Sequence, residues 1–258
     1  MTKIIMHGCN GRMGQMISRI VRERDDAEIV AGIDVANNIS NDYPVFTDID
    51  ACDVDADVLI DFSTAKAVDR LLDYCEKKSL PVVLCTTGLS DDQLDRAHAL
   101  SEKIAVLKSA NMSLGINLLQ KLLKDAASIL APAGFDIEIV EKHHRMKLDA
   151  PSGTALALAD SVNEALGNEY EYVYDRSVRR EKRPDKEIGI SAVRGGTIVG
   201  DHDVIFAGTD EVVTFSHIAY SRAVFAKGAV SAAMFLAGRK AGFYDMSDVI
   251  EDTLGKGN

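Results

Sequence analysis

The sequence has no long apolar run, few cysteines and no excess of positive charge, and each shortage excludes a class of protein. No stretch approaches the roughly 20 apolar residues that span a bilayer, and residues 1–6 do not read as a signal peptide. The four cysteines, at positions 9, 52, 75 and 85, are too scattered for a zinc knuckle or a disulfide framework. We therefore expect reduced thiols in a cytoplasmic protein that binds no metal.

The shortage of positive charge bears on partners. The net charge of −11 repels nucleic acids and anionic membranes, so we expect neither as a partner. An anionic substrate must then be bound by a local group of basic side chains. The chain has 258 residues, 47% of them hydrophobic and 27% charged, which suits one large globular domain or two modest ones. It contains no internal repeat.

Short apolar runs alternate with helical patterns in the first part of the chain. This order predicts an α/β fold with a Rossmann-like, doubly wound parallel sheet. The expected strands are 3–7, 28–33, 58–62, 82–85 and 105–108, and the expected helices are 11–24, 65–77 and 91–100.

The later part of the chain has a different pattern. Helices are expected at 113–130 and 154–166, and strands at 136–141, 188–193, 204–207 and 212–217, followed by a helix at 222–241. Strands with few helices between them indicate a mixed or antiparallel sheet. We expect one domain formed by residues 1–113 and 222–258 and a second, α+β domain formed by 114–221.

A glycine-rich segment, GCNGRMG at residues 8–14, follows the first expected strand and opens a helix. Glycines allow a sharp turn and a close approach to a pyrophosphate, which the free N–H groups of the helix start can bind. A second strand then ends at Asp34, where a carboxylate can accept the ribose hydroxyls. Strand, glycines, helix, strand and acid in this order predict a dinucleotide-binding domain.

Asp34 also bears on the choice of cofactor. Its carboxylate repels a 2′-phosphate, and residues 35–38 bring no cation. Arg12 is the one nearby basic group that can accept a phosphate. The sequence therefore favours NADH, with NADPH left open.

Two further loops follow expected strands, where such sheets bind ligands. Residues 86–88 are Thr-Thr-Gly, and residues 110–113 are Ala-Asn-Met-Ser. Their polar side chains can bind a nicotinamide ring or cap a helix, and spacing alone does not decide between these roles.

The segment 141–155, EKHHRMKLDAPSGTA, gathers basic side chains in an acidic protein just before a Pro-Ser-Gly-Thr helix start. Histidine transfers protons near neutral pH, and basic side chains with helix N-terminal amides bind carboxylates. A solvated basic loop with a capping Ser152 or Thr154 is the alternative. A second basic run, residues 176–186, we interpret as a solvated loop; it can also steer an anionic substrate or contact another subunit.

Residues 143–155 resemble the signature of the 4-hydroxy-tetrahydrodipicolinate (formerly dihydrodipicolinate) reductase family. Residues 8–14 are similar to the N-terminal motif of that family, and residues 221–222 together with 225–229 to its C-terminal one. The resemblance covers nearly the whole chain. It implies NAD(P)H-dependent reduction of a cyclic imine dicarboxylate in the diaminopimelate branch of lysine biosynthesis, and a homotetramer built through the second domain.

The resemblance also implies roles for individual residues. His143 and Lys147 correspond to the proton donors of the family, and His144, Gly153 and Thr154 to its substrate contacts. The implied cofactor contacts are Gly8, Cys9, Asn10, Gly11, Arg12, Met13, Asp34, Cys85, Thr86, Thr87, Ser109, Ala110, Asn111 and Met112. Cys85 departs from the glycine that is usual in the family, which narrows the nicotinamide end of the site.

Two other functions remain possible from the residues alone. Another two-domain dehydrogenase is one, but a semialdehyde dehydrogenase needs a nucleophilic cysteine, and none of the four lies near the histidine pair. A catalytically silent NAD sensor is the other, and such a protein has no need of His143 and Lys147.

Overall fold

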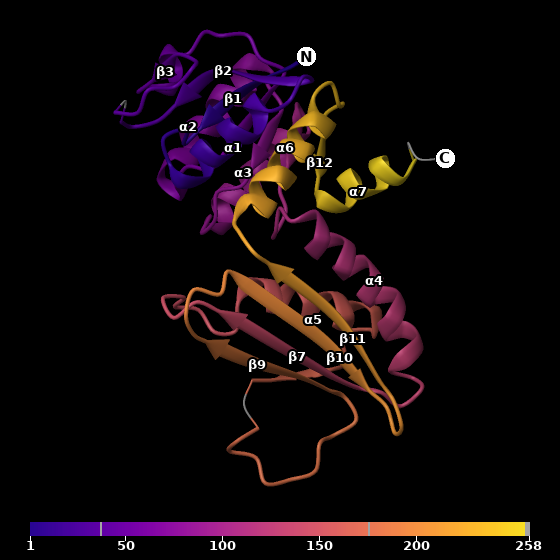
Figure 1. Ribbon diagram of the computed structural model, residues 1–258. Coiled ribbons are helices and arrows are strands. Elements are labelled where there is room, and N and C mark those ends of the chain that lie inside the picture. Colours follow the sequence, from indigo (N-terminus) through magenta and orange to yellow (C-terminus); the bar gives the residue numbers. More distant parts are fainter. Residues whose placement is uncertain (37, 175, 256–258) are drawn as a thin grey trace. The chain divides into compact units, whose positions relative to one another are not determined.

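The computed structural model describes residues 1–36, 38–174 and 176–255. The chain forms two compact units (Figure 1). The first unit combines Met1–Leu114 with Ala223–Asn258, and the central unit is Gly115–Arg222. These boundaries lie one residue from those expected from the sequence.

The sheet of the first unit is parallel throughout, as the alternating pattern predicted. Its strand order is β12-β6-β5-β4-β1-β2-β3. The strands are β1 (Thr2–His7), β2 (Ala27–Ile33), β3 (Val45–Phe46), β4 (Val58–Asp61), β5 (Val82–Leu84), β6 (Ala105–Leu107) and β12 (Gly242–Tyr244). The helices are α1 (Arg12–Arg22), α2 (Ala65–Lys78), α3 (Asp91–Ser101), α6 (Ala223–Leu236) and α7 (Met246–Gly255), with a 3-10 turn at Ile49–Ala51.

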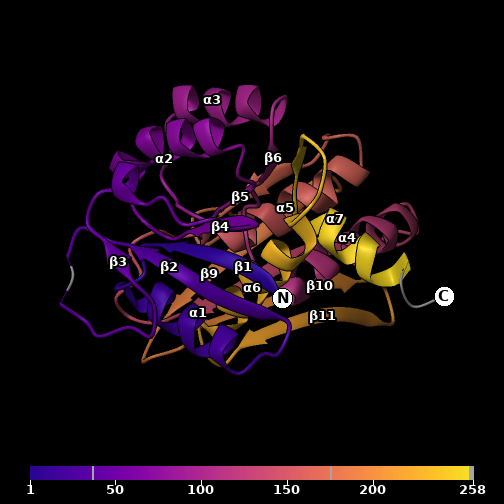
Figure 2. The same ribbon diagram turned by 90° about the horizontal axis from the view of Figure 1, so that it is seen from above.

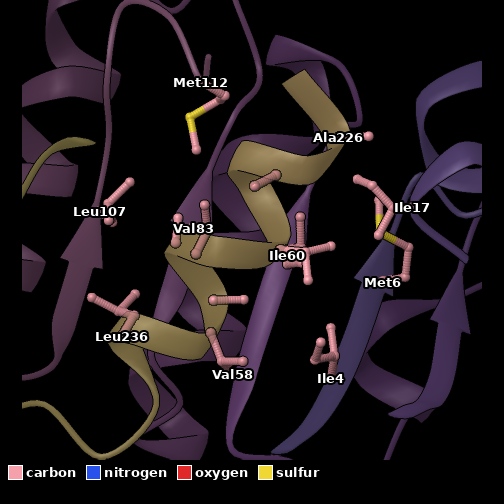
Figure 3. Packing of buried hydrophobic residues seen from close by; sticks show 14 of the residues in the cluster. Ile4, Met6, Ile17, Val58, Ile60, Val83, Leu107, Met112, Ala226 and Leu236 are labelled. Carbon is pink, nitrogen blue, oxygen red and sulfur yellow. The ribbon is translucent and has the colours of Figure 1, made fainter. Parts of the chain in front are cut away.

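Helices cover both faces of this sheet, which explains why its strands are apolar in continuous runs. Ile4 and Met6 of β1 pack with α1 and α6 on one face, while Ile5 faces α2 and α3 on the other. Figure 2 shows α2 and α3 on one side of β1 and β2 and α1 on the opposite side. In Figure 3, Ala226 and Leu236 of α6 lie against the apolar side chains of the central strands.

The last part of the chain differs from the expectation of one helix at 222–241. Helix α6 ends at Leu236, because Gly238 adopts a left-handed conformation with φ +78°. The chain then adds β12 beside β6 and continues into α7. A strand of three residues carries too little periodicity to be recognised in a sequence.

The sheet of the central unit is mixed, with the order β11-β10-β7-β9-β8. Its strands are β7 (Asp136–His143), β8 (Glu171–Val173), β9 (Glu187–Arg194), β10 (Gly200–Ala207) and β11 (Val212–Ala219). Helices α4 (Leu114–Leu130) and α5 (Gly153–Ala165) pack on one face of it (Figure 1). Strand β10 starts before the expected residue 204, since its polar beginning resembles a loop.

Strand β7 alternates buried and half-buried residues. Ile137 and Ile139 face the core under the helices, and the same period of two places Glu141 and His143 on that face at the end of the strand. The alternation that builds the core thus also buries a carboxylate and an imidazole side by side.

Candidate functional site

The glycine-rich loop joins β1 to α1 in a conformation that side chains would block. Gly8 has φ +80°, and a Cβ on it would lie 2.5 Å from the carbonyl oxygen of Phe62. A Cβ on Gly14 would lie 2.2 Å from the carbonyl oxygen of Gly8. Gly11 is the N-cap of α1 and brings no capping side chain. The N–H groups of the first turn are therefore not capped by that residue, as an anion-binding helix start requires.

Asp34 follows β2 and is tied to this loop. Its carboxylate accepts a hydrogen bond from the amide of Asn10 at 2.9 Å and a weak one from Ala36 at 3.4 Å. The Asn10 side chain donates in turn to the carbonyl of Ala36. A cavity of about 320 Å³ opens here, lined by Gly8, Asn10, Gly11 and Asp34 among others. Glycine backbone beside a carboxylate fits a dinucleotide.

Two cations that the sequence reasoning missed lie near Asp34. A neighbouring cavity of about 370 Å³ is lined by Asp34, Val35, Lys66 and Arg70. Arg70 is paired with Asp48 at 2.6 Å and with Asp50. The expectation that Arg12 is the one basic group near Asp34 is therefore wrong. Helix α2 brings Lys66 and Arg70, which are distant in the sequence, to the cavity beside Asp34.

The loops after β5 and β6 lie at the same sheet edge as Asp34. The helix after residues 86–88 is capped by Ser90 in a capping box with Gln93, so Thr86 and Thr87 are not its N-cap. Asn111 accepts a hydrogen bond from the amide of Ser113 at 2.8 Å. Met112 is buried in the core, which leaves only its backbone for a ligand.

Cys85 belongs to a row of polar groups at the ends of adjacent strands. Burial raises the pKa of its thiol well above the ordinary value, so it stays protonated. Burial also lowers the pKa of Lys108, which interacts with Cys85 and Asp61. Asp61 is fully buried and lies 2.9 Å from the Nδ1 of His7. Neither His7 nor Asp61 was singled out in the sequence.

His143 lies at the end of β7 with 8% of its surface exposed. Its Nδ1 is 2.6 Å from the Oε2 of Glu141, which is fully buried. Glu141 also accepts two hydrogen bonds from Arg194, at 2.7 and 2.6 Å, and one from the amide of Ser152 at 2.9 Å. Burial raises the pKa of Glu141, but these hydrogen bonds outweigh burial and leave the pKa lowered.

His202 of β10 packs edge-on against His143, with ring centres 5.1 Å apart. Its Nε2 lies 3.2 Å from the hydroxyl of Ser152, the N-cap of α5. Burial and the neighbouring His143 lower the pKa of His202 to about 4, so it is neutral at pH 7. The roles of Glu141, Arg194 and His202 were not predicted from the sequence. One signal was available, because Glu141 is a charged residue at a core-facing position of β7 and a buried carboxylate needs polar partners.

The shifted pKa of His202 predicts a dependence of stability on pH. The unfolded histidine, with a pKa near 6.5, binds more protons than the folded one as the pH falls towards 4. Well above pH 6.5 this group should not affect the free energy of unfolding. Between pH 7 and pH 5 it should lower the free energy of unfolding by about 2 kcal/mol. Urea unfolding at both pH values should show a smaller decline for His202→Gln. An equal decline in the variant would contradict the assignment.

Lys147 already holds a carboxylate of its own chain. Its Nζ lies 2.9 Å from the Oδ1 of Asp149, and only 21% of the Lys147 side chain is exposed. The hydrogen bond from Lys147, and a further one from the amide of Gly153, lower the pKa of Asp149. His144 and Thr154 are half-buried in the same segment. The candidate substrate residues thus lie in one segment that leads into α5. Two of them, Lys147 and Gly153, contact the carboxylate of Asp149.

The basic run 176–186, which we interpret from the sequence as a solvated loop, is solvated only in part: Arg180, Lys182 and Lys186 are exposed, whereas three arginines pair with acidic side chains. Arg176 pairs with the fully buried Glu187, and Arg179 pairs with Glu171 at 3.1 Å. Arg183 bonds to Asp136 at 2.8 Å and Glu138 at 3.0 Å, with 16% of its side chain exposed. These guanidinium groups fold back onto acidic side chains of the central unit because each finds a partner there.

The described part of the chain shows no group of His, Cys, Asp and Glu side chains that could hold a metal ion. Its four cysteines are free thiols. Among residues 1–36, 38–174 and 176–255, no helix combines the length and hydropathy needed to cross a bilayer.

Comparison with known proteins identifies the family. A family model described as dihydrodipicolinate reductase, N-terminus, matches residues 2–112, and one described as its C-terminus matches residues 115–250. The chain belongs to the dihydrodipicolinate reductase family. It is therefore a pyridine-nucleotide-dependent oxidoreductase, and the resemblance noted in the sequence is confirmed.

Individual relatives agree with this assignment. The 4-hydroxy-tetrahydrodipicolinate reductase of Caldanaerobacter subterraneus subsp. tengcongensis is 52% identical over 97% of this chain and 99% of the relative. The enzyme of the same name from Clostridium novyi is 49% identical over the same shares. A dipicolinate-bound dihydrodipicolinate reductase from Paenisporosarcina sp. TG-14 superposes with a TM-score of 0.80, at 26% identity, over 95% of this chain and 97% of that one.

Proposed function

We propose that this reductase converts 4-hydroxy-tetrahydrodipicolinate to tetrahydrodipicolinate with loss of water, in the diaminopimelate branch of lysine biosynthesis. The observation that carries the proposal is the buried imidazole of His143, held by Glu141, in the same segment as the carboxylate-binding Lys147. A proton donor and a carboxylate site are what the reduction of a cyclic imine dicarboxylate requires.

His143 acts as the proton donor in this proposal. Loss of water from the substrate, as the hydroxyl group and a proton of the adjacent ring carbon, gives a conjugated ring. A bound dihydronicotinamide would supply a hydride to the carbon that carried the hydroxyl group, which leaves an enamine. The adjacent carbon then needs a proton to restore the imine. His143 supplies it from its ring, which is neutralised in place, and a water molecule restores the proton afterwards.

Lys147, His144, Gly153 and Thr154 bind the substrate carboxylates. The contact of Lys147 and the Gly153 amide with Asp149 supports this role, because a substrate carboxylate needs the same kinds of donor. A substrate carboxylate that takes these donors displaces the side chain of Asp149. Asp149 thereby keeps the site from standing open to other anions.

The first unit binds the cofactor in this proposal, and the central unit binds the substrate and forms a homotetramer. The contacts proposed for the cofactor are Gly8, Cys9, Asn10, Gly11, Arg12, Met13, Asp34, Cys85, Thr86, Thr87, Ser109, Ala110, Asn111 and Met112. The open face of the central sheet, which carries the exposed Val212 and Ile218 of β11, supports oligomerisation there. Sedimentation velocity should show a tetramer, and a monomer would contradict this part of the proposal.

Asp34 makes NADH the preferred cofactor, while Lys66 gives a 2′-phosphate a partner and keeps NADPH usable. Asp34→Ala should weaken NADH binding about 10- to 100-fold, as expected for lost hydrogen bonds to a charged group. It should change NADPH binding little, because repulsion of the phosphate is lost too. Asp34→Asn is the matched control, since it keeps an acceptor for the Asn10 amide and removes only the charge. A preference for NADPH in the unmodified enzyme would sink this assignment.

The proposed function is tested by cofactor oxidation on freshly generated substrate. NADH and NADPH should each be consumed only when 4-hydroxy-tetrahydrodipicolinate is present, in proportion to the tetrahydrodipicolinate formed. Dipicolinate, a planar dicarboxylate, should compete with the substrate. Absence of substrate-dependent oxidation with both cofactors would refute the proposal.

A further inference from the structure

The buried carboxylate of Glu141, near the end of β7, has four polar contacts. Oε2 accepts from Arg194 and faces the His143 ring, and Oε1 accepts from Arg194 and from the amide of Ser152. These four contacts use all the acceptor positions of a carboxylate. Glu141 is fully buried and the Arg194 side chain is 19% exposed, so the desolvation of the carboxylate offsets much of the attraction between them and the pair adds little net stability. We propose that Glu141 is the positioning residue of His143, and that Arg194 keeps it in that role.

The first consequence concerns the tautomer of His143. Arg194 holds a permanent charge against Glu141 in a bidentate pair, so the carboxylate is ionised and can only accept hydrogen bonds. The Nδ1 of His143, 2.6 Å away, must therefore carry a hydrogen in both protonation states of the ring. The proton that the ring gains and releases is then the one on Nε2.

The surroundings of Nε2 agree with this role. Among the residues that the structure describes, Nε2 has no hydrogen-bond partner. A Cβ on Gly200 would lie 3.0 Å from it, so the glycine leaves room beside this nitrogen. The neutral His202 packs against the ring edge-on and stops it from turning. Nε2 is thus the nitrogen with space for a substrate atom.

The second consequence concerns charge. When the His143 ring is neutral, the charges of Glu141 and Arg194 cancel. When the ring is protonated, the three side chains together carry a net positive charge, which attracts a dicarboxylate. Glu141 without Arg194 would hold the ring proton more strongly and hinder its transfer. Arg194 also donates to the carbonyl of Asp149 at 2.7 Å, which ties the same group to the segment that carries Lys147.

The inference rests on the proposed function, and the test is chosen to separate the two. The ring nitrogens of His143 are followed by NMR in the ¹⁵N-histidine-labelled full-length enzyme, which needs no substrate. At a pH where the ring is neutral, the hydrogen should be on Nδ1, and in Glu141→Gln the signals should move. A neutral ring that carries its hydrogen on Nε2 in the unmodified enzyme would overturn the inference even if the enzyme is active.

Kinetics provide the second readout. In Glu141→Gln, kcat should fall at least about tenfold, which is part of the 10²–10⁴-fold effect of a positioned acid. KM should stay within about threefold, and the decline of kcat at alkaline pH should start at lower pH, because the charge that favours the protonated ring is gone. Arg194→Gln, which removes the charge that offsets Glu141, should move that decline to higher pH. Wild-type kcat and pH profile in Glu141→Gln would contradict the inference.

The control is a second buried glutamate of the same sheet. Glu187 is also fully buried and paired with arginine, but its partners are Arg176 and, at 3.8 Å, Arg179, and it lies at the other end of β9 from Arg194. Glu187→Gln should lower the urea midpoint about as much as Glu141→Gln while leaving the pH profile in place. Equal shifts of the pH profile in both variants would show a purely structural role and overturn the inference.

Discussion

His143→Gln should lower kcat by about 10²–10⁴-fold, the usual contribution of a positioned general acid. Glutamine can accept or donate a hydrogen bond towards Glu141, but it cannot deliver a proton at neutral pH. The dissociation constant of NADH should change less than about twofold, because His143 belongs to the central unit and the glycine loop to the first unit. Steady-state kinetics beside NADH titration by fluorescence measure both quantities.

Arg145→Ala is the matched control for this variant. Arg145 lies two residues further along the same basic segment and is exposed. Its loss should leave kcat within about twofold of the unmodified enzyme. If the segment were only a solvated basic face, both substitutions would be equally mild. Near-normal turnover of His143→Gln would remove that residue from the acid role and make His144 the next candidate.

Lys147→Ala should act on binding as well as on rate. A hydrogen bond to a charged group contributes about 1.5–3 kcal/mol, so kcat/KM should fall about 10- to 100-fold. Part of that fall should be a higher KM, since the carboxylate is bound in the ground state and the transition state alike. The inhibition constant of dipicolinate should rise in parallel, and kinetics with both ligands check this.

Asp149→Asn tests the same site in the opposite direction. The amide competes less well than the carboxylate of Asp149 for Lys147, so the KM of the substrate should fall while the NADH constant stays unchanged. A higher KM in Asp149→Asn would show that Asp149 supports the site rather than occupying it.

A Lys147→Ala variant with unchanged KM and unchanged dipicolinate inhibition would exclude Lys147 from carboxylate binding.

Much of the fold could be predicted because its signals are local. The apolar runs of β1, β4 and β5 and the helical periods between them require only sequence spacing to be recognised. Strand β12 could not be predicted, because three residues gain their strand conformation from pairing with β6. The polar start of β10 was missed for a related reason, since the contacts of the buried His202 with Ser152 and His143 join residues that are distant in the sequence.

The candidate site divides along the same line. The glycine loop, Asp34 and the segment from His143 to Thr154 are continuous motifs, and the sequence indicates their chemistry. Arg194 lies 53 positions from Glu141 and reaches it only through the pairing of β7 with β9. Lys66 reaches the cavity beside Asp34 only through the packing of α2. Partners assembled by the sheet have no local signature.

The most direct test of the central claim follows a labelled hydrogen. The enzyme is supplied with 4-hydroxy-tetrahydrodipicolinate and NADH that carries deuterium at the transferable position of its nicotinamide ring. The account predicts a product with one deuterium, on the ring carbon that carried the hydroxyl group, and a solvent-derived proton on the carbon next to it, as NMR of the product would show. A product without deuterium at that carbon would contradict hydride transfer from the cofactor to this substrate.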